Sequence, residues 1–154
     1  MAVKVTKIEV WSGEIRDQPG GLAGVLEQLA RTNANLEMVV ARRQPDKPGS
    51  GVVFVAPLKG KKAMEVAATA GLGPAPGVAA LRVEGTDRPG LGARMTTAIA
   101  EAGVNLRGLS AAVIGNRFAA NMAFDSAEDA EKAARVLKSV LAAKAPAKKK
   151  AGKR

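Results

Sequence analysis

The sequence contains an internal repeat, and a chain with such a repeat is expected to fold as two copies of one unit. Residues 16–38 align without a gap on residues 86–108 when Asp17 is placed on Asp87. Several of the identical residues are typical of turns. The identical pairs are Asp17/Asp87, Pro19/Pro89, Gly20/Gly90, Ala23/Ala93, Ala30/Ala100, Asn35/Asn105 and Leu36/Leu106. Two matched turns at one spacing favour a duplicated unit of about seventy residues over one domain of continuous design.

Each copy shows the same order of hydrophobic periods. A β-rich run, 5–11 in the first copy and 78–83 in the second, leads into an Asp-x-Pro-Gly turn. A helical pattern follows, with apolar residues at i, i+3 and i+4 that we interpret as a core-facing stripe. The stripe residues are Leu22, Val25, Leu26 and Leu29 in the first copy, and Leu91, Met95, Ile99 and Ala102 in the second.

Strand alternation and a second helix complete the pattern. We expect strands at 36–43 and 51–56 around the loop 44–50, and in the second copy at 109–114 and 118–124 around Gly115-Asn116. A helix at 61–70 ends at Gly71, and a second one begins at Ser126, where Asp129 resembles the partner of a capping box. The order β-α-β-β-α predicts an α+β fold of two ferredoxin-like units, with antiparallel sheets and both helices on one face.

The expected boundaries are 1–72 for the first unit, 73–77 for a linker, 78–141 for the second unit and 142–154 for a disordered basic tail. Neither copy has a clear final strand after its second helix. Because an unpaired sheet edge invites pairing with another chain, we expect a homodimer in which the run 3–11 completes a neighbour's sheet.

The composition excludes several kinds of chemistry. The 154 residues include no His, no Cys and no Tyr. Imidazole-based triads, thiol nucleophiles and Cys/His zinc sites are therefore impossible, and no acidic or glycine-rich metal or phosphate motif is present. We expect no catalytic residues, no metal and no cofactor. The absence of disulfides, of a signal-like start and of long apolar runs predicts a soluble cytoplasmic protein without a membrane partner.

The basic charge is concentrated at the end of the chain. The whole sequence has 24 Lys and Arg against 14 Asp and Glu, a formal charge of +10. Residues 142–154 hold six basic residues and no acid, so residues 1–141 keep 18 basic against 14 acidic residues, or +4. The tail is either a solvated segment or an electrostatic handle for nucleic acid. Its basic residues are Lys144, Lys148, Lys149, Lys150, Lys153 and Arg154.

The two turns are the candidate ligand sites. Each leads into a helix N-terminus, whose amides lack helical partners and favour an anion. A carboxylate could rest on the amides of Gly20, Gly21 and Leu22, or on those of Gly90, Leu91 and Gly92. Asp17 and Asp87 either bind the ligand's ammonium group or hold their own turns, and Asn35 and Asn105 precede the second strands. A purely structural role for all these residues is the alternative.

The motif Asp-x-Pro-Gly before a helix and Asn-Leu before a strand, within this element order, resembles the ACT domain. The resemblance covers roughly residues 5–71 and 78–141, and the first copy is similar to the regulatory ACT domains of aspartate kinases. It implies that a ligand, usually an amino acid, sits between paired ACT units, held by the turn of one and the second strand of the other. The chain as a whole resembles stand-alone tandem ACT proteins, which implies a non-catalytic regulator of an enzyme in trans. The alternative is a dimeric nucleic-acid-associated protein that binds through its tail.

Overall fold

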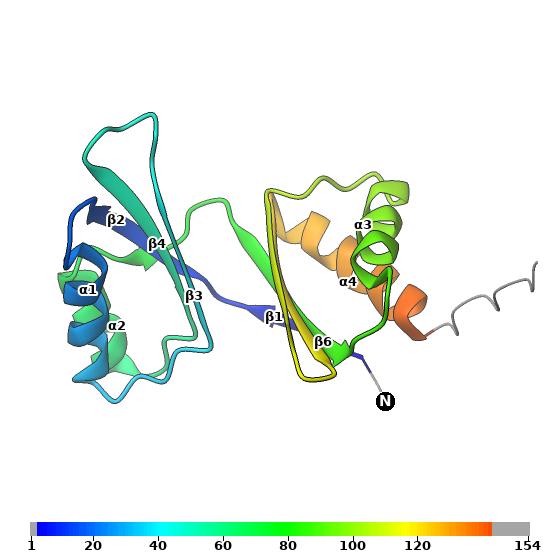
Figure 1. Ribbon diagram of the computed structural model, residues 1–154, viewed down its shortest axis with the longest axis horizontal. Helices are drawn as coiled ribbons and strands as arrows, with labels where there is room; N and C mark the ends of the chain where they lie inside the picture. The colour runs from blue at the N-terminus through cyan, green and yellow to red at the C-terminus, as the bar shows by residue number, and fades with distance from the viewer. Residues whose placement is uncertain (1–2, 143–154) are drawn as a thin grey trace, which may run out of the picture.

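The computed structural model describes residues 3–142 and divides them into two α+β units (Figure 1). The elements of the first unit are β2 (Trp11–Arg16), α1 (Gly21–Ala30), β3 (Met38–Arg43), β4 (Ser50–Ala56), α2 (Lys61–Thr69) and β5 (Gly73–Pro74). Those of the second are β1 (Lys4–Ile8), β6 (Ala79–Thr86), α3 (Leu91–Glu101), β7 (Gly108–Ile114), β8 (Arg117–Phe124) and α4 (Ala127–Ala142). The α+β class expected from the periodicities is confirmed.

The sheets are antiparallel and have matching strand orders. One runs β3-β4-β2-β5 and the other β7-β8-β6-β1. A ferredoxin-like unit places the strand that follows its second helix at one edge of its sheet. That edge position is occupied by β5, beside β2, in the first sheet and by β1, beside β6, in the second. The N-terminal strand β1 therefore supplies, from within the same chain, the edge strand of the second sheet.

This pairing differs from the boundaries expected from the repeat. Residues 4–8 belong to the second sheet and not to the first unit, and Gly73–Pro74, expected in a linker, form the fourth strand of the first sheet. The run 3–11 completes a sheet as expected, but that sheet is in its own chain and not in a neighbour. The physical reason is a break at Glu9 and Val10, which lets β1 and β2 enter different sheets.

Local signals explain most element ends. Asp129 donates its backbone N–H to Ser126 Oγ at 3.1 Å, which caps α4. Gly71 has φ of 89°, and its N–H and that of Leu72 donate to the carbonyls of Ala68 and Ala67, which ends α2. Gly115, with φ of 62°, begins the two-residue turn between β7 and β8. The capping and hairpin predictions are confirmed.

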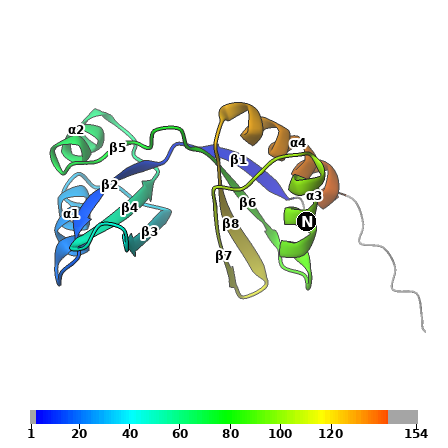
Figure 2. The ribbon, with the colours of Figure 1, turned by 90° about the horizontal axis from the view of Figure 1, so that it is seen from above.

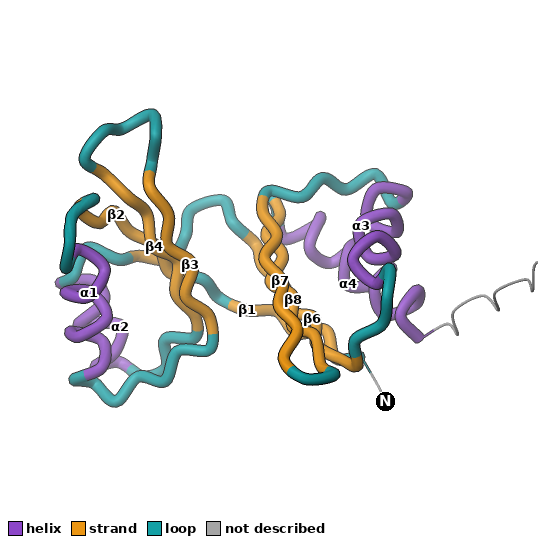
Figure 3. The backbone as a smooth tube through the Cα atoms, viewed as in Figure 1, coloured by secondary structure: helices purple, strands orange, loops and turns teal. Residues whose placement is uncertain are grey.

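Each unit packs its helices on one face of its sheet (Figures 2 and 3). The first core gathers Leu29, Val53, Val55 and Trp11, and the second gathers Ile99, Leu81, Phe124 and Leu137. The sole Trp is thus a core residue. A third cluster, which we call the mini-core, joins the units; it comprises the buried residues Val10, Met38, Ala56 and Ala80, with Ile8, Val40, Phe54 and Ala75 packed against it.

The predicted basic tail lies outside the described residues, except for Ala142, which ends α4. Within the described part of the chain, no helix is long and apolar enough to span a membrane. No group of three or more Asp and Glu residues in that part is arranged to hold a metal ion.

Candidate functional site

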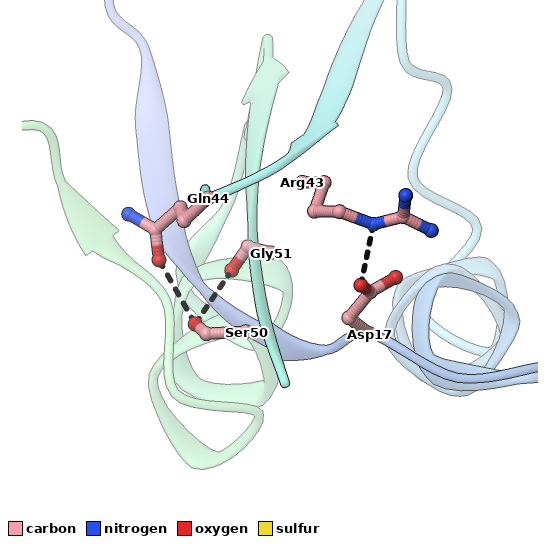
Figure 4. Close-up of polar contacts among 5 residues, drawn as sticks. All are labelled: Asp17, Arg43, Gln44, Ser50 and Gly51. Atoms are coloured by element: carbon pink, nitrogen blue, oxygen red, sulfur yellow. Dashed lines mark hydrogen bonds and ion pairs between the residues drawn. The ribbon is translucent and has the colours of Figure 1, made fainter. Parts of the chain in front are cut away.

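The first Asp-x-Pro-Gly turn is held by polar contacts with the neighbouring hairpin (Figure 4). The Asp17 carboxylate accepts a hydrogen bond from Arg43 Nε at 2.5 Å, and the Asp17 N–H donates to the carbonyl of Gly49 at 3.0 Å. Ser50 Oγ donates to Gln44 Oε1 at 2.9 Å in the same hairpin. Asp17 is therefore already engaged by a guanidinium, which supports the structural alternative for this copy.

The second turn is held differently. The Asp87 N–H donates to the carbonyl of Asn116 at 2.8 Å, and the Leu91 N–H donates to that of Arg88 at 3.2 Å. Within residues 3–142, no ion pair or hydrogen bond engages the Asp87 carboxylate, whose side chain is exposed. The two copies thus share a turn but differ in the availability of its carboxylate.

Both turns present helix N-termini with accessible space. Gly20 and Gly90 have φ of 85° and 79° and precede α1 and α3. A Cβ at Gly20, Gly90 or Gly92 would meet no atom within 4 Å, so there is open space beside these three residues. Gly21 differs, because its Cβ would lie 2.1 Å from the Arg16 carbonyl oxygen.

Some of the predicted amide donors are already used. The Gly21 N–H donates to the carbonyl of Gln18 at 3.0 Å, just as Leu91 does to that of Arg88. The amides of the next two residues of each helix find no acceptor in the described part of the chain; they are Leu22 and Ala23 in α1, and Gly92 and Ala93 in α3. Of the predicted amides, those of Gly21 and Leu91 are therefore already used, whereas those of Leu22 and Gly92 have no acceptor in the described residues.

The asparagines lie far from the turns of their own units. Asn35 follows the C-terminus of α1, and Asn105 follows that of α3. Since the ten residues of α1 rise roughly 15 Å along the axis, turn and asparagine lie at opposite ends of the helix. Both asparagines are exposed. A ligand that touches both motifs would have to lie between two units.

The two units of one chain do not supply that pairing. In both views, the β2–α1 connection lies on the side of the first unit that is turned away from the second, and the β6–α3 connection lies on the outer side of the second unit (Figures 1 and 2). The open sheet faces, not the turns, are directed toward the other unit. A paired site built on these turns would need another chain.

Sequence and structure comparisons now bear on the family. Residues 80–148 match the sequence profile described as the ACT domain. The second half matches the ACT domain family. No protein of curated function matches the sequence.

Solved structures share the fold of both units. The regulatory subunit of aspartate kinase from Thermus thermophilus, in its ligand-free form, is 22% identical with a TM-score of 0.65, over 91% of this chain and 97% of that one. The corresponding Thermus flavus subunit is 23% identical with a TM-score of 0.57, over 92% and 97%. A protein from Bacteroides thetaiotaomicron is 14% identical with a TM-score of 0.72, over 85% and 88%. This chain is similar to them in fold.

An ion pair ties the ACT-matching half to the first unit. Arg82 of β6 donates to the Glu37 carboxylate, and its Nε donates to Asn121 Oδ1 at 3.5 Å. The Arg82 side chain is only 13% exposed, and its Nη2 is buried with no hydrogen-bond partner. The hydrogen bond from Arg82 and its positive charge lower the pKa of Glu37, with smaller help from Lys59 and Lys4. Sequence reasoning did not identify this pair, because its partners are distant along the chain.

A cleft between the open faces of the two sheets was also not predicted. It has a volume of about 430 Å³. On the first sheet it is lined by Met38, Val40, Phe54 and Arg42, and on the ACT-matching unit by Ala80, Gly108, Ser110 and Ala123 among others. Among the residues that the structure describes, its charged lining residues are Arg42 and Arg107. No sequence signal marks this cleft, since it depends on how the units pack.

Proposed function

We propose that this chain is a non-catalytic regulatory protein that binds a small ligand, an amino acid, where two of its ACT-like units pair. The proposal is supported by the ACT match of residues 80–148 and by the fold shared with aspartate kinase regulatory subunits. One observation carries it: in residues 3–142 the amides of Gly92 and Ala93 have no acceptor, and the Asp87 carboxylate in the turn before α3 has no partner.

The second turn is the better candidate on chemical grounds. The ligand's carboxylate would accept hydrogen bonds from the free amides at the start of α3, where the helix dipole is favourable. Its ammonium group would pair with Asp87. At the first turn Asp17 is held by Arg43, so an ammonium group would have to displace a guanidinium. Asn105 or Asn35 of a second copy would complete the site.

Regulation would follow from pairing. A ligand bound between two chains favours the arrangement in which both contribute, and it shifts the population toward that arrangement. A homodimer is therefore part of the proposal, and so is a partner enzyme that responds to its packing.

A thermal-shift screen of the twenty amino acids tests the proposal. A ligand selective for the native state at about a hundredfold excess over its Kd adds roughly 2.7 kcal/mol of stability. We expect one or a few amino acids to raise Tm. Gly92→Val should abolish this shift, because the valine side chain would cover the α3 amides, and a Cβ at position 92 would meet no atom within 4 Å. Gly20→Val and Gly90→Val test the turns directly.

The matched control for Gly90→Val is Gly103→Val. Gly103 also has positive φ, 74°, and open space around its Cβ, but it lies at the other end of α3. Loss of the shift in Gly90→Val with retention in Gly103→Val locates the ligand at the turn. If none of the amino acids shifts Tm at millimolar concentration, the proposal is wrong. Nucleic-acid binding with a steep salt dependence that disappears when residues 143–154 are deleted would favour the nucleic-acid alternative.

A further inference from the structure

We infer that the cleft between the two sheets is a second ligand site, for a small monocarboxylate with an apolar body. It is separate from the Asp-x-Pro-Gly turns, which lie on the outer sides of the units (Figure 2). The inference rests on the shape, the lining and the charge of the cleft.

The cleft exists because the two walls differ in side-chain size. The wall on the first sheet carries Met38, Val40 and Phe54, whereas the open face of the second sheet carries Ala80, Gly108 and Ala123. Leu109 and Met122 also line the cleft, but strand alternation directs their side chains to the face that the helices cover. Small residues on one wall leave space that the large residues of the other do not fill. Met38 and Ala80 are also buried members of the mini-core, so part of the cleft lining is made of packed side chains that join the two units.

The lining favours an apolar body of limited size. Small-molecule sites are mostly apolar cavities of about 300–1,000 Å³ with few polar groups, and they are frequent between domains. This cleft, at about 430 Å³, falls within that range. Its uncharged polar groups include Ser110 and Asn121, so the apolar side chains dominate the walls.

The charge of the cleft favours an anion. Arg42 extends from the first sheet and Arg107 from the second unit, and none of the described residues that line the space is acidic. Strand alternation places Arg42 on the open face beside Met38 and Val40, while Arg43 points to the Asp17 side. In the described part of the chain, no hydrogen bond or ion pair engages the Arg42 guanidinium.

The second guanidinium is held in place but keeps donors available. Arg107 Nη1 donates to the carbonyl of Gly77 at 3.2 Å and lies 3.9 Å from the Asp125 carboxylate. A guanidinium has five N–H donors, so these contacts leave others for a ligand. Both guanidinium groups line the same space, and a guanidinium binds a carboxylate through bidentate hydrogen bonds.

Calorimetric titration with 3-phenylpropanoate tests the site, and 3-phenylpropanamide serves as its uncharged counterpart. Neither probe has an ammonium group, so the outcome is independent of the amino-acid proposal. We expect saturable binding of the carboxylate at a stoichiometry of one per chain and at least about tenfold weaker binding of the amide. Arg42→Gln should weaken carboxylate binding by about tenfold or more and reduce the discrimination against the amide.

Two further variants distinguish binding in the cleft from binding elsewhere on the protein. Gly108→Val should abolish binding, because a Cβ there meets only Ala123 Cβ at 3.9 Å and the added methyl groups enter the cleft. Arg43→Gln, one residue from Arg42 but on the other face, should leave the affinity unchanged. Thermal unfolding of each variant verifies that it is folded.

Three results would overturn the inference. The first is no saturable binding of 3-phenylpropanoate up to about 10 mM. The second is equal weakening by Arg42→Gln and Arg43→Gln, since that indicates a general charge effect. The third is an affinity that falls as protein concentration rises, because a second copy would then occupy the cleft.

Discussion

Gly21 lies where the first turn meets its helix, and it has no room for a side chain. Its Cβ would lie 2.1 Å from the Arg16 carbonyl oxygen, a backbone atom that cannot move away alone. The equivalent position in the second unit is Leu91, which is buried in the core. The two turns therefore share residues but not backbone course, and the first is the tighter one.

Gly21→Ala should consequently destabilise the protein by about 2 kcal/mol or more, since the backbone must shift to relieve the clash. Gly24→Ala is the matched control, three residues further along α1, where a Cβ meets no atom within 4 Å. Alanine is a better helix former than glycine, so this variant should gain about 0.5–1 kcal/mol. Urea unfolding measures both, and equal effects of the same sign would contradict the assignment.

The ion pair between Glu37 and Arg82 connects the two units, and its contribution to the free energy of unfolding depends on pH. The folded protein lowers the pKa of Glu37 below the ordinary value of 4.5, chiefly through the hydrogen bond from Arg82. A lowered pKa contributes stability above the unfolded-state pKa, and that contribution is lost as pH falls through the folded value.

The difference in unfolding free energy between the wild type and Glu37→Gln should therefore be constant from neutral pH to about 4.5 and shrink below it. Denaturant titrations at a series of pH values measure this difference. Glu14 forms an ion pair with Lys47 inside the first unit at 2.6 Å. Glu14→Gln is therefore the control, because it removes an ion pair but should leave the inter-unit contact intact. A difference that grows toward acid pH would show that the sign is wrong.

At the scale of elements, the strand β1 completes the second sheet from the opposite end of the chain. Its five residues pair with β6, and Val5 packs against the core of the second unit. Lys7 of the same strand forms an ion pair with Glu131 of α4 at 3.0 Å. Removing β1 exposes one edge of β6 and part of the second core, and leaves the strands β2–β5 paired as before.

Deletion of residues 1–8 should thus increase amide hydrogen exchange in β6 strongly and leave exchange in β4 nearly unchanged. Mass spectrometry of proteolytic peptides covering 79–86 and 50–56 measures the two strands separately. Deletion of residues 143–154 is the control, and it should alter neither peptide. Equal deprotection of both strands would mean that the units unfold as one.

Local chemistry made most elements predictable. Gly71, Gly115 and Ser126 each specify an end through φ or a hydrogen bond, and the sequence predicts those ends correctly. The edge strands were not predictable in the same way. No glycine, proline or asparagine separates Ile8 from Trp11, so β1 and β2 read as one run, and Gly73–Pro74 is too short for alternation.

The candidate site was predictable only in part. The turns and their glycines follow from the repeat, and so do the helix N-termini behind them. Whether each carboxylate has a partner depends on residues far along the chain: Arg43 pairs with the Asp17 carboxylate, and no described residue pairs with the Asp87 carboxylate. The inter-sheet cleft depends on packing between units, for which one sequence carries no periodic signal.

At the scale of the whole molecule, the four sheet edges differ in protection. The edge strand β3 ends with Arg42 and Arg43, and β5 has only two residues. The edge strand β7, GLSAAVI, has seven residues without charge or proline. Most of its side chains are exposed, with Val113 at 52% and Ile114 at 84%. Uncharged exposed edges tend to pair with another chain.

We therefore expect a homodimer in sedimentation at micromolar concentration, with β7 paired to its copy. Val113→Lys should yield monomers, because a charge on an edge strand opposes such pairing. Met64→Lys, at another exposed apolar position but on α2, should leave the dimer intact. A wild-type monomer at micromolar concentration would rule out the dimer and with it the paired ligand site.

The pairing of β1 with β6 of the second unit also has a consequence during synthesis. The partner of β1 is β6, and residues 9–78 lie between the two strands. At about 5–20 residues per second on the ribosome, β1 waits several seconds before β6 exists. The first unit, from β2 to β5, is complete in that interval and can fold, while β1 stays an unpaired strand. The order of translation therefore separates the folding of the first unit from that of the second. The β1–β6 pairing, whose strands are far apart in the sequence, forms late.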